Sequence, residues 1–279
     1  MDLFLNRIAP IQVNYLGYPG TMSADFMDYI VADPVVIPVG SQKFYSEKVI
    51  YLPDTYQVND SKREISEKIF DRSELGLPQE AFVFCCFNNS FKILPQVFDS
   101  WMRILKAVTG SVLWLLDDNS TSTKNLRREA SRRGVDPSRL VFAKRLPIAE
   151  HLARHKCADL FLDTLPYNAH TTASDALWAG LPIVTRIGQS FAARVAASLL
   201  TAAGLPELIT TSVDAYEQLA IDLGNNPDKA RALKEKLAAQ RLSSKLFDTP
   251  LFVKHLEAAY VEIFERYKAA LPADHIFIK

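Results

Sequence analysis

Short apolar runs alternate with helical patterns along the chain from about residue 81 onward. Continuous apolar runs bounded by polar loops are typical of strands that are buried on both faces. By this criterion the predicted strands cover residues 81–87, 112–116, 140–143, 159–162, 183–185 and 208–210. Each is followed by a connection long enough to hold a helix, which favours parallel strands.

Apolar residues with helical spacing fill most of these connections. The clearest stripe consists of Leu94, Val97, Phe98, Trp101, Ile104, Leu105 and Val108, and Pro95 is tolerated in its first turn. Further helices are predicted over residues 124–133, 149–156, 172–179, 191–203, 213–223, 228–241 and 250–269. The alternation predicts an α/β fold, a Rossmann-like doubly wound parallel sheet with strand order 3-2-1-4-5-6.

The first seventy-odd residues have a different pattern. Strands are predicted over residues 10–15, 29–32 and 48–51, with long loops that contain proline and a single helix at residues 62–69. This segment is too small to bury a core alone. We therefore expect residues 1–75 to be the remnant of an N-terminal lobe with a linker, and residues 76–279 to form the second lobe. The apolar stretches 8–15 and 35–39 are expected to be exposed.

Composition narrows the function classes. The 279 residues are 48% hydrophobic, enough for a large core, and 32 basic residues balance 32 acidic ones. This balance argues against binding to nucleic acid or to an anionic membrane surface, and no apolar run is long enough to span a bilayer. Cys85, Cys86 and Cys157 suggest neither a metal site nor a disulfide framework. Together with an N-terminus unlike a signal peptide, they predict a cytoplasmic protein.

A polar loop between the fourth strand and the next helix carries candidate chemistry. Its sequence runs from Asp163 to Thr172, and the helix that follows ends at Gly180. The unpaired amides at a helix start suit a phosphate, and Thr171 or Thr172 can cap the helix and offer a hydroxyl. Asp175, one turn further, can accept hydrogen bonds from the two ribose hydroxyls. A purely structural role, with a threonine cap and an aspartate favoured by the helix dipole, stays open.

The first and fourth strands are neighbours in the expected order, so their following loops border the crevice where such sheets bind ligands. The loop after the first strand holds Asn89 and Lys92, which can bind a diphosphate. His151 and Arg154 share one face of a helix, near the place that a base would reach. Alternatively, Lys92 is simply solvated, and His151 and Arg154 are surface residues of an amphipathic helix. Without a glycine-rich dinucleotide fingerprint or a P-loop, a dehydrogenase or ATPase is disfavoured.

These residues resemble a known family. Matching segments include Ala9-Pro10-Ile11-Gln12-Val13-Asn14-Tyr15-Leu16-Gly17-Tyr18-Pro19-Gly20-Thr21, Phe87-Asn88-Asn89-Ser90-Phe91-Lys92, Asn168-Ala169-His170-Thr171-Thr172 with Asp175, and Ser190-Phe191-Ala192-Ala193-Arg194-Val195-Ala196-Ala197-Ser198. The chain resembles the catalytic region of the protein O-linked N-acetylglucosamine transferases, particularly the bacterial ones. The resemblance covers nearly the whole chain.

The resemblance implies a two-lobed GT-B glycosyltransferase, of which this chain would hold the second lobe and the end of the first. It implies UDP-N-acetylglucosamine as donor, a protein or peptide acceptor, inversion at the anomeric carbon, and no metal or other cofactor. By motif position Lys92 and Asn89 would contact the diphosphate, opposite Thr171 and Thr172. The remaining positions would place His170 near the sugar and phosphate, Asp175 on the ribose, His151 and Arg154 by the uracil, and Gly17 and Pro19 facing the sugar.

The chain departs from the family pattern at several places. Asn89 and Phe91 stand where the family can carry Gln and Tyr, and Ile148 stands where it can place a lysine against the base. An upstream tetratricopeptide-repeat region and the opening of the first lobe are expected but lie outside this sequence. Three functions stay open at this point: a transferase, a catalytically impaired UDP-binding fragment, and a chain that needs a partner to supply the missing half-lobe.

Overall fold

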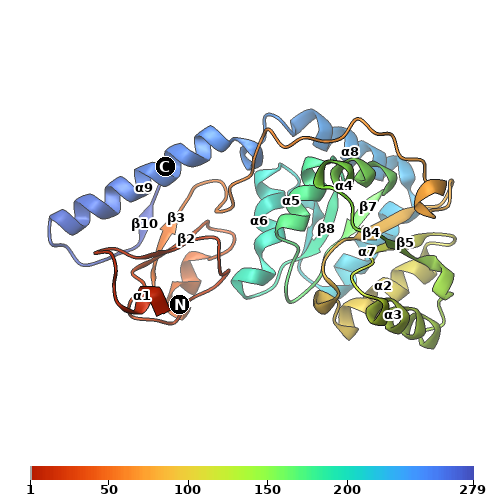
Figure 1. Cartoon of the computed structure of the whole chain (residues 1–279), viewed down its shortest axis with the longest axis horizontal. Coiled ribbons are helices and arrows are strands. Elements are labelled where there is room, and N and C mark those ends of the chain that lie inside the picture. The colour runs from red at the N-terminus through yellow and green to blue at the C-terminus, as the bar shows by residue number, and fades with distance from the viewer. Residues whose placement is uncertain (1) are drawn as a thin grey trace.

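Two parallel sheets lie side by side in the computed structural model, which describes residues 2–279 (Figure 1). The larger sheet has the order β6-β5-β4-β7-β8-β9, which confirms the predicted 3-2-1-4-5-6 arrangement. Its strands are β4 (Val83–Cys86), β5 (Val112–Leu116), β6 (Leu140–Ala143), β7 (Leu160–Leu162), β8 (Ile183–Arg186) and β9 (Ile209–Thr210). The larger sheet and its helices form the second lobe of the sequence prediction.

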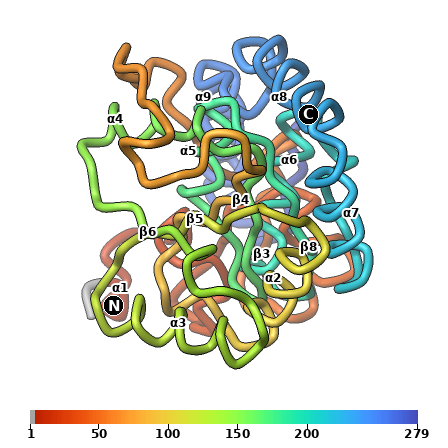
Figure 2. Tube along the Cα trace, turned by 90° about the vertical axis from the view of Figure 1, so that its right-hand side faces the viewer, coloured from red at the N-terminus to blue at the C-terminus, as the bar shows by residue number. Residues whose placement is uncertain are grey.

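Helices cover both faces of the larger sheet, as the alternating pattern predicts. The helices of this lobe are α2 (Pro95–Ala107), α3 (Ser120–Arg132), α4 (Ile148–Arg154), α5 (Thr171–Trp178), α6 (Val195–Ala202), α7 (Val213–Asn225) and α8 (Pro227–Gln240). Helices α4, α5 and α6 cover one face, and α2, α3 and α7 cover the other (Figure 2). The helix predicted over residues 191–203 is shorter, because residues 191–193 form a 3-10 turn before α6.

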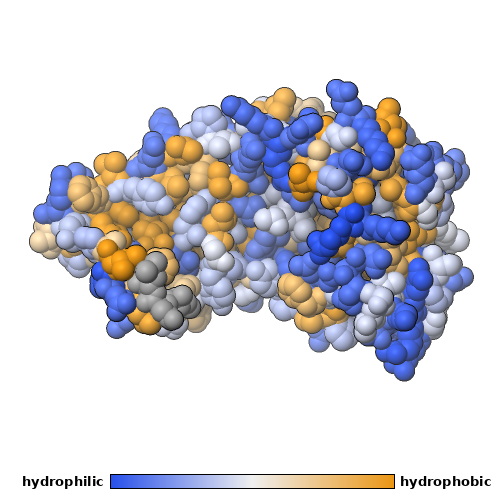
Figure 3. Space-filling view, viewed as in Figure 1, coloured by the Kyte–Doolittle hydropathy of each residue, from blue (hydrophilic) through white to orange (hydrophobic). Residues whose placement is uncertain are grey.

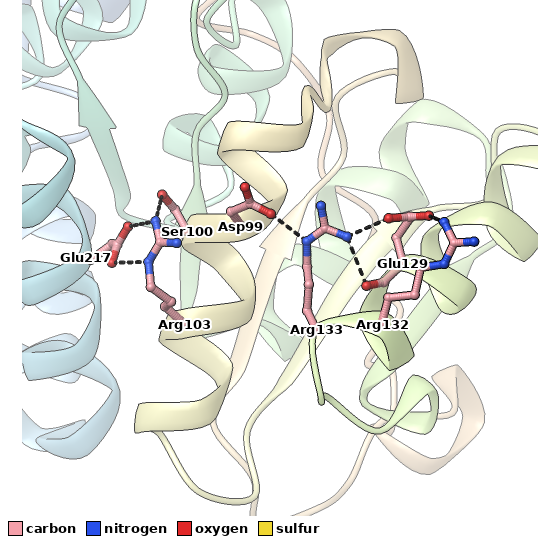
Figure 4. Close-up of polar contacts among 7 residues, drawn as sticks. All are labelled: Asp99, Ser100, Arg103, Glu129, Arg132, Arg133 and Glu217. Carbon is pink, nitrogen blue, oxygen red and sulfur yellow. Dashed lines mark hydrogen bonds and ion pairs between the residues drawn. The ribbon is translucent and has the colours of Figure 1, made fainter.

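Ion pairs join the helices on the second of these faces. Arg103 of α2 makes two hydrogen bonds with the carboxylate of Glu217 on α7, at 2.9 and 2.6 Å (Figure 4). Arg133, just after α3, binds Asp99 of α2 at 2.5 Å and Glu129 of its own helix at 2.6 Å. Helices α3, α2 and α7 are therefore held in a row across this face.

The smaller sheet is built from both ends of the chain. Its order is β1 (Val13–Asn14), β2 (Tyr29–Ala32), β3 (Lys48–Tyr51) and β10 (Ile276–Phe277). The long helix α9 (Thr249–Lys268) packs on one face, where its apolar residues meet alternate residues of the strands (Figure 1). Residues 249–279, which the sequence analysis assigned to the second lobe, thus pack on the smaller sheet. A short helix, α1 (Asp2–Leu5), precedes β1.

The two sheets share one continuous core. Ile30, Ala32 and Val49, on the face of the small sheet opposite α9, belong to the same apolar cluster as the large sheet. The buried carboxylate of Asp33 accepts hydrogen bonds from the amides of residues 35, 36 and 56 and, at 2.6 Å, from the Ser198 hydroxyl of α6. Burial raises the pKa of this carboxyl group. The two lobes are therefore locked together through polar as well as apolar contacts.

Two predictions for the first part of the chain are wrong. Residues 62–69 are not helical; they run extended over the second lobe, where the Ser66 amide bonds the Ala149 carbonyl at 3.1 Å. Ile65 of this segment packs on the core, whereas Ile69 is 92% exposed. Tertiary contacts override a helical pattern here. Within the stretch 35–39, which was expected to be exposed, Val36 and Ile37 are buried in the interface between the lobes.

Candidate functional site

The candidate site lies where β4 and β7, the two central strands, end. The chain leaves β4 into a 3-10 turn, Ser90–Lys92, and leaves β7 into the loop 163–170 that leads to α5. Because β4 is followed by α2 on one face and β7 by α5 on the other, the two connections diverge and border the crevice of a doubly wound sheet. The predicted loops therefore do come together.

Lys92 reaches across from the β4 loop to the β7 loop. Its Nζ donates a hydrogen bond to the Asn168 carbonyl at 2.8 Å and lies 4.2 Å from the centre of the Tyr167 ring. The ring face is electronegative, so it stabilises the ammonium group. Burial lowers the pKa of Lys92, and this effect outweighs the nearby carboxylate of Asp163. Lys92 is thus a half-buried cation with donor capacity to spare.

Asp163 holds the β7 loop in place. Its carboxylate accepts hydrogen bonds from the amides of Thr164 (2.7 Å) and Ala169 (2.6 Å) and from the Thr185 hydroxyl (2.6 Å). Burial raises its pKa to about 6. Sequence reasoning quoted Asp163 in the loop but gave it no role. A carboxylate at the end of a central strand was the available signal.

The start of α5 differs in detail from its prediction. His170 is the N-cap residue and makes no capping hydrogen bond, so Thr171 and Thr172 are the first two helical residues and neither is the cap. The amides of these two residues have no acceptor within the helix, as at any helix start. The Thr172 hydroxyl donates to the side-chain oxygen of Asn88, whose amide in turn donates to the Thr164 hydroxyl at 2.8 Å. Asn88, to which sequence reasoning gave no role, therefore ties the two loops together.

His170 is a neutral side chain with a defined tautomer. Its Nε2 lies 3.2 Å from the Ala192 carbonyl oxygen, and its ring stacks on Tyr167 at 4.8 Å between centres. A carbonyl can only accept, so Nε2 carries the proton and Nδ1 is left as an acceptor. Burial, with a contribution from the Lys92 charge, lowers the pKa of His170 to about 4.

A cavity of about 250 Å³ joins the loop of the first lobe to the start of α5. Leu16, from the loop after β1, lines one side, and His170 and Thr171 line the other. Gly17 and Pro19 belong to the same loop; Gly17 is exposed, and its amide bonds the Tyr15 carbonyl at 2.7 Å. Neither Gly17 nor Pro19 lines the cavity, and their predicted position facing the sugar stays a prediction.

Asp175 is paired with an arginine from the segment that links the lobes. Its carboxylate accepts a hydrogen bond from Arg63 Nη1 at 2.5 Å, and the two side chains are 13% and 25% exposed. Burial raises the pKa of Asp175, while Arg63 opposes the rise. Arg63 also lines the cavity described above. Sequence reasoning missed Arg63 because it placed this segment in a helix.

His151 and Arg154 share a helix face, as predicted, but Arg154 is only 1% exposed. The alternative that Arg154 is a surface residue is therefore wrong. Its guanidinium lies 4.6 Å from the Phe87 ring centre, and its Nη2 contacts His151 Nδ1 at 2.5 Å. Arginine can only donate, so His151 accepts at Nδ1 and carries its proton on Nε2. Burial lowers the pKa of His151 to about 3, and the neutral ring keeps one donor for a ligand.

The remaining predicted residue, Asn89, is exposed at the start of the Ser90–Lys92 turn. Phe91 beside it is 71% exposed. The predicted contact between Asn89 and a diphosphate stays a prediction. Among residues 2–279, no group of three or more His, Cys, Asp or Glu side chains is placed to hold a metal ion. Nor does any helix in that range combine the length and apolarity needed to cross a bilayer.

Comparison with known proteins places the chain in a family. The model described as glycosyl transferase family 41 matches residues 1–72 and 63–256. The chain belongs to glycosyl transferase family 41. Within this family it is 39% identical, over 98% of its length, to the probable UDP-N-acetylglucosamine–peptide N-acetylglucosaminyltransferase SEC of Arabidopsis thaliana. It is 29% identical to the UDP-N-acetylglucosamine–peptide N-acetylglucosaminyltransferase of Caenorhabditis elegans.

The fold of this family 41 chain matches a solved structure over 94% of its length. An O-GlcNAc transferase mutant of Thermobaculum terrenum superimposes with a TM-score of 0.85 and 33% identity. An Anabaena protein solved with UDP and glucose has a TM-score of 0.57 at 17% identity, which shows the fold alone. The GT-B fold predicted from the sequence is thereby confirmed. The chain spans 29% of the Arabidopsis protein, 34% of the Caenorhabditis protein and 49% of the Thermobaculum chain.

Proposed function

We propose that this chain binds UDP-N-acetylglucosamine in the crevice beside Lys92 and α5, as the donor side of a transferase that glycosylates Ser or Thr hydroxyls of proteins. The observation that carries this proposal is the convergence of Lys92, His170 and the free amides at the start of α5. Family membership and the names of the relatives support the same donor and acceptor classes.

The arrangement suits an inverting displacement without a metal ion. The acceptor hydroxyl would lose its proton to solvent as its oxygen forms a bond to the anomeric carbon, while the bond from that carbon to the diphosphate oxygen breaks and its electron pair leaves with UDP. Lys92 and the amides of Thr171 and Thr172 would stabilise the charge that grows on UDP. His170, neutral and with Nδ1 free to accept, would bind a sugar hydroxyl. His151 would donate from Nε2 to the base, and Asp175 would accept from the ribose.

Calorimetric titration tests the donor site. UDP and UDP-N-acetylglucosamine should both bind. Lys92→Ala should weaken the binding free energy of UDP by about 1.5–3 kcal/mol, the scale of a charge-assisted hydrogen bond. Lys106→Ala, which removes an equal charge from an exposed position on α2, serves as the control. If both variants bind UDP as the original chain does, the phosphate assignment fails.

A second candidate function, UDP binding with impaired transfer, is favoured by the open edge of the small sheet. Within residues 2–279, β1 pairs only with β2. Beside it, Ile11, Val13 and residues of α9 line an apolar hollow. Figure 3 shows apolar residues gathered over this part of the molecule. An acceptor hydroxyl must be positioned for transfer, so we expect this chain alone to bind UDP but to transfer little sugar. Transfer from radiolabelled UDP-N-acetylglucosamine to peptides, at the rate of a longer relative, would refute the impairment.

A further inference from the structure

A second cavity lies behind the β7 loop, between α2 and α7. Its volume is about 260 Å³, and apolar side chains from three elements line most of it: Leu94 and Val97 at the start of α2, Leu165 and Pro166 in the loop, and Val213 of α7. It opens on the sheet face covered by α2 and α7, whereas the donor residues His170 and Asp175 belong to the α5 side. The proposed donor site does not account for it.

Hydrogen bonds hold the walls of this cavity rigid. The Trp101 indole of α2 donates to the Tyr216 hydroxyl of α7 at 3.0 Å, and that hydroxyl donates to the Asp163 carbonyl at 3.1 Å. The ion pair of Arg103 with Glu217, the residue after Tyr216, joins the same two helices (Figure 4). Because helices and loop are cross-linked, the cavity is preformed rather than a gap that a helix shift would close.

Arg186, the last residue of β8, is the one cation in the lining. Within residues 2–279 its guanidinium has no hydrogen bond or ion pair. The carboxylate in the lining, Asp163, is already committed, because it accepts three hydrogen bonds from the loop and Thr185. An arginine offers a planar pair of donors that matches a carboxylate. The cavity therefore combines an apolar body with a single unpaired carboxylate-binding group.

We propose that this cavity binds a small carboxylate with an aromatic or branched apolar body, its carboxylate on Arg186 and its body between Val97, Pro166 and Val213. The size supports such a ligand, because an apolar cavity of about 150 Å³ takes benzene and drug-sized pockets begin at about 300 Å³. The unpaired planar donors of Arg186 favour the acid over a neutral molecule of the same size.

The test compares 3-phenylpropionate with 3-phenylpropanol, which has the same apolar body without the charge, by ligand-observed NMR and calorimetry on the whole chain. The acid should bind saturably, and about tenfold to a hundredfold tighter than the alcohol, as expected of a charged hydrogen-bonded pair. Arg186→Gln should remove this difference, and Arg186→Lys should restore part of it. Arg128→Gln, at an exposed position on α3, should behave as the original chain.

Two further measurements fix the location. Val97→Trp should fill the cavity and abolish binding of both probes, while an excess of UDP should not displace the acid. The proposal is overturned if the acid fails to bind saturably, if acid and alcohol bind equally, or if Arg186→Gln keeps the preference for the acid. Displacement by UDP would place the acid on the donor side instead and would equally overturn it.

Discussion

Replacing Asp175 with asparagine separates a ribose ligand from a residue that only supports the helix. The carboxylate now binds Arg63 at 2.5 Å in a half-buried pair. Such a pair lies between an exposed one, worth up to about 1 kcal/mol, and a buried one, whose disruption costs about 3–5 kcal/mol. We expect Asp175→Asn to lower the unfolding free energy by about 1–3 kcal/mol, which is roughly 3–10 °C in melting temperature for a domain of this size.

The ribose role adds an effect on binding that the structural role lacks. A carboxylate that accepts from a ribose hydroxyl contributes about 1.5–3 kcal/mol, so the Kd for UDP should rise roughly tenfold to a hundredfold in Asp175→Asn. The preference for UDP over 2′-deoxy-UDP should fall with it. Arg63→Gln is the matched control, because it breaks the same ion pair and leaves the carboxylate in place.

Calorimetry and thermal melts on both variants decide the matter. The expected outcome is two variants of similar melting temperature, of which Asp175→Asn alone loses UDP affinity. If both melt lower while both still bind UDP as the original chain does, Asp175 supports the helix and the ribose assignment is wrong.

Three other predictions follow from the buried polar groups and the apolar surface. Asp33→Ala leaves three amides and a hydroxyl without an acceptor and should lower the unfolding free energy by about 3 kcal/mol or more in urea denaturation; a loss under 1 kcal/mol would contradict it. Burial lowers the pKa of His151 to about 3 and the pKa values of His155 and His170 to about 4. The stability that these neutral rings contribute is therefore complete above pH 6.5 and is lost as pH falls through about 4, by about 3 kcal/mol for His155. A urea midpoint that does not change with pH would contradict this prediction. We also expect the chain to self-associate through the apolar surface beside β1, to which the exposed Phe264 of α9 belongs. Phe264→Glu should reduce this association in sedimentation velocity, and unchanged association would point to another surface.

The large sheet could be predicted because its signals are local. Each strand is an apolar run, and the connection rules leave few orders for six parallel strands. The same reasoning brought Lys92 and the loop that carries His170 to one crevice, because the carboxyl ends of neighbouring strands meet there. Their partners, the Asn168 carbonyl and the Tyr167 ring, depend on how the β7 loop turns, which no periodicity encodes.

The first part of the chain was harder to predict because its structure depends on distant contacts. A helix is predicted over residues 62–69, but the Arg63 side chain binds Asp175 and the Ser66 amide bonds the Ala149 carbonyl, so contacts with the second lobe decide the conformation of this segment. The position of β10 could not be predicted either. It pairs with β3 across more than two hundred residues, and a two-residue strand carries too little pattern to be recognised.

The pairing of β10 with β3 also sets an order of events during synthesis. Ile276 pairs with Ile50, and the His275 ring accepts a hydrogen bond from the Val49 amide at 2.9 Å. Both contacts form only after the entire second lobe has left the ribosome, whereas that lobe holds all six of its own strands and can fold first. Until α9 arrives, the side of β2 and β3 that carries Val31 and Ile50 has no cover. The smaller sheet therefore begins before the second lobe and is completed after it, and a nascent chain exposes this apolar surface while the second lobe is being translated.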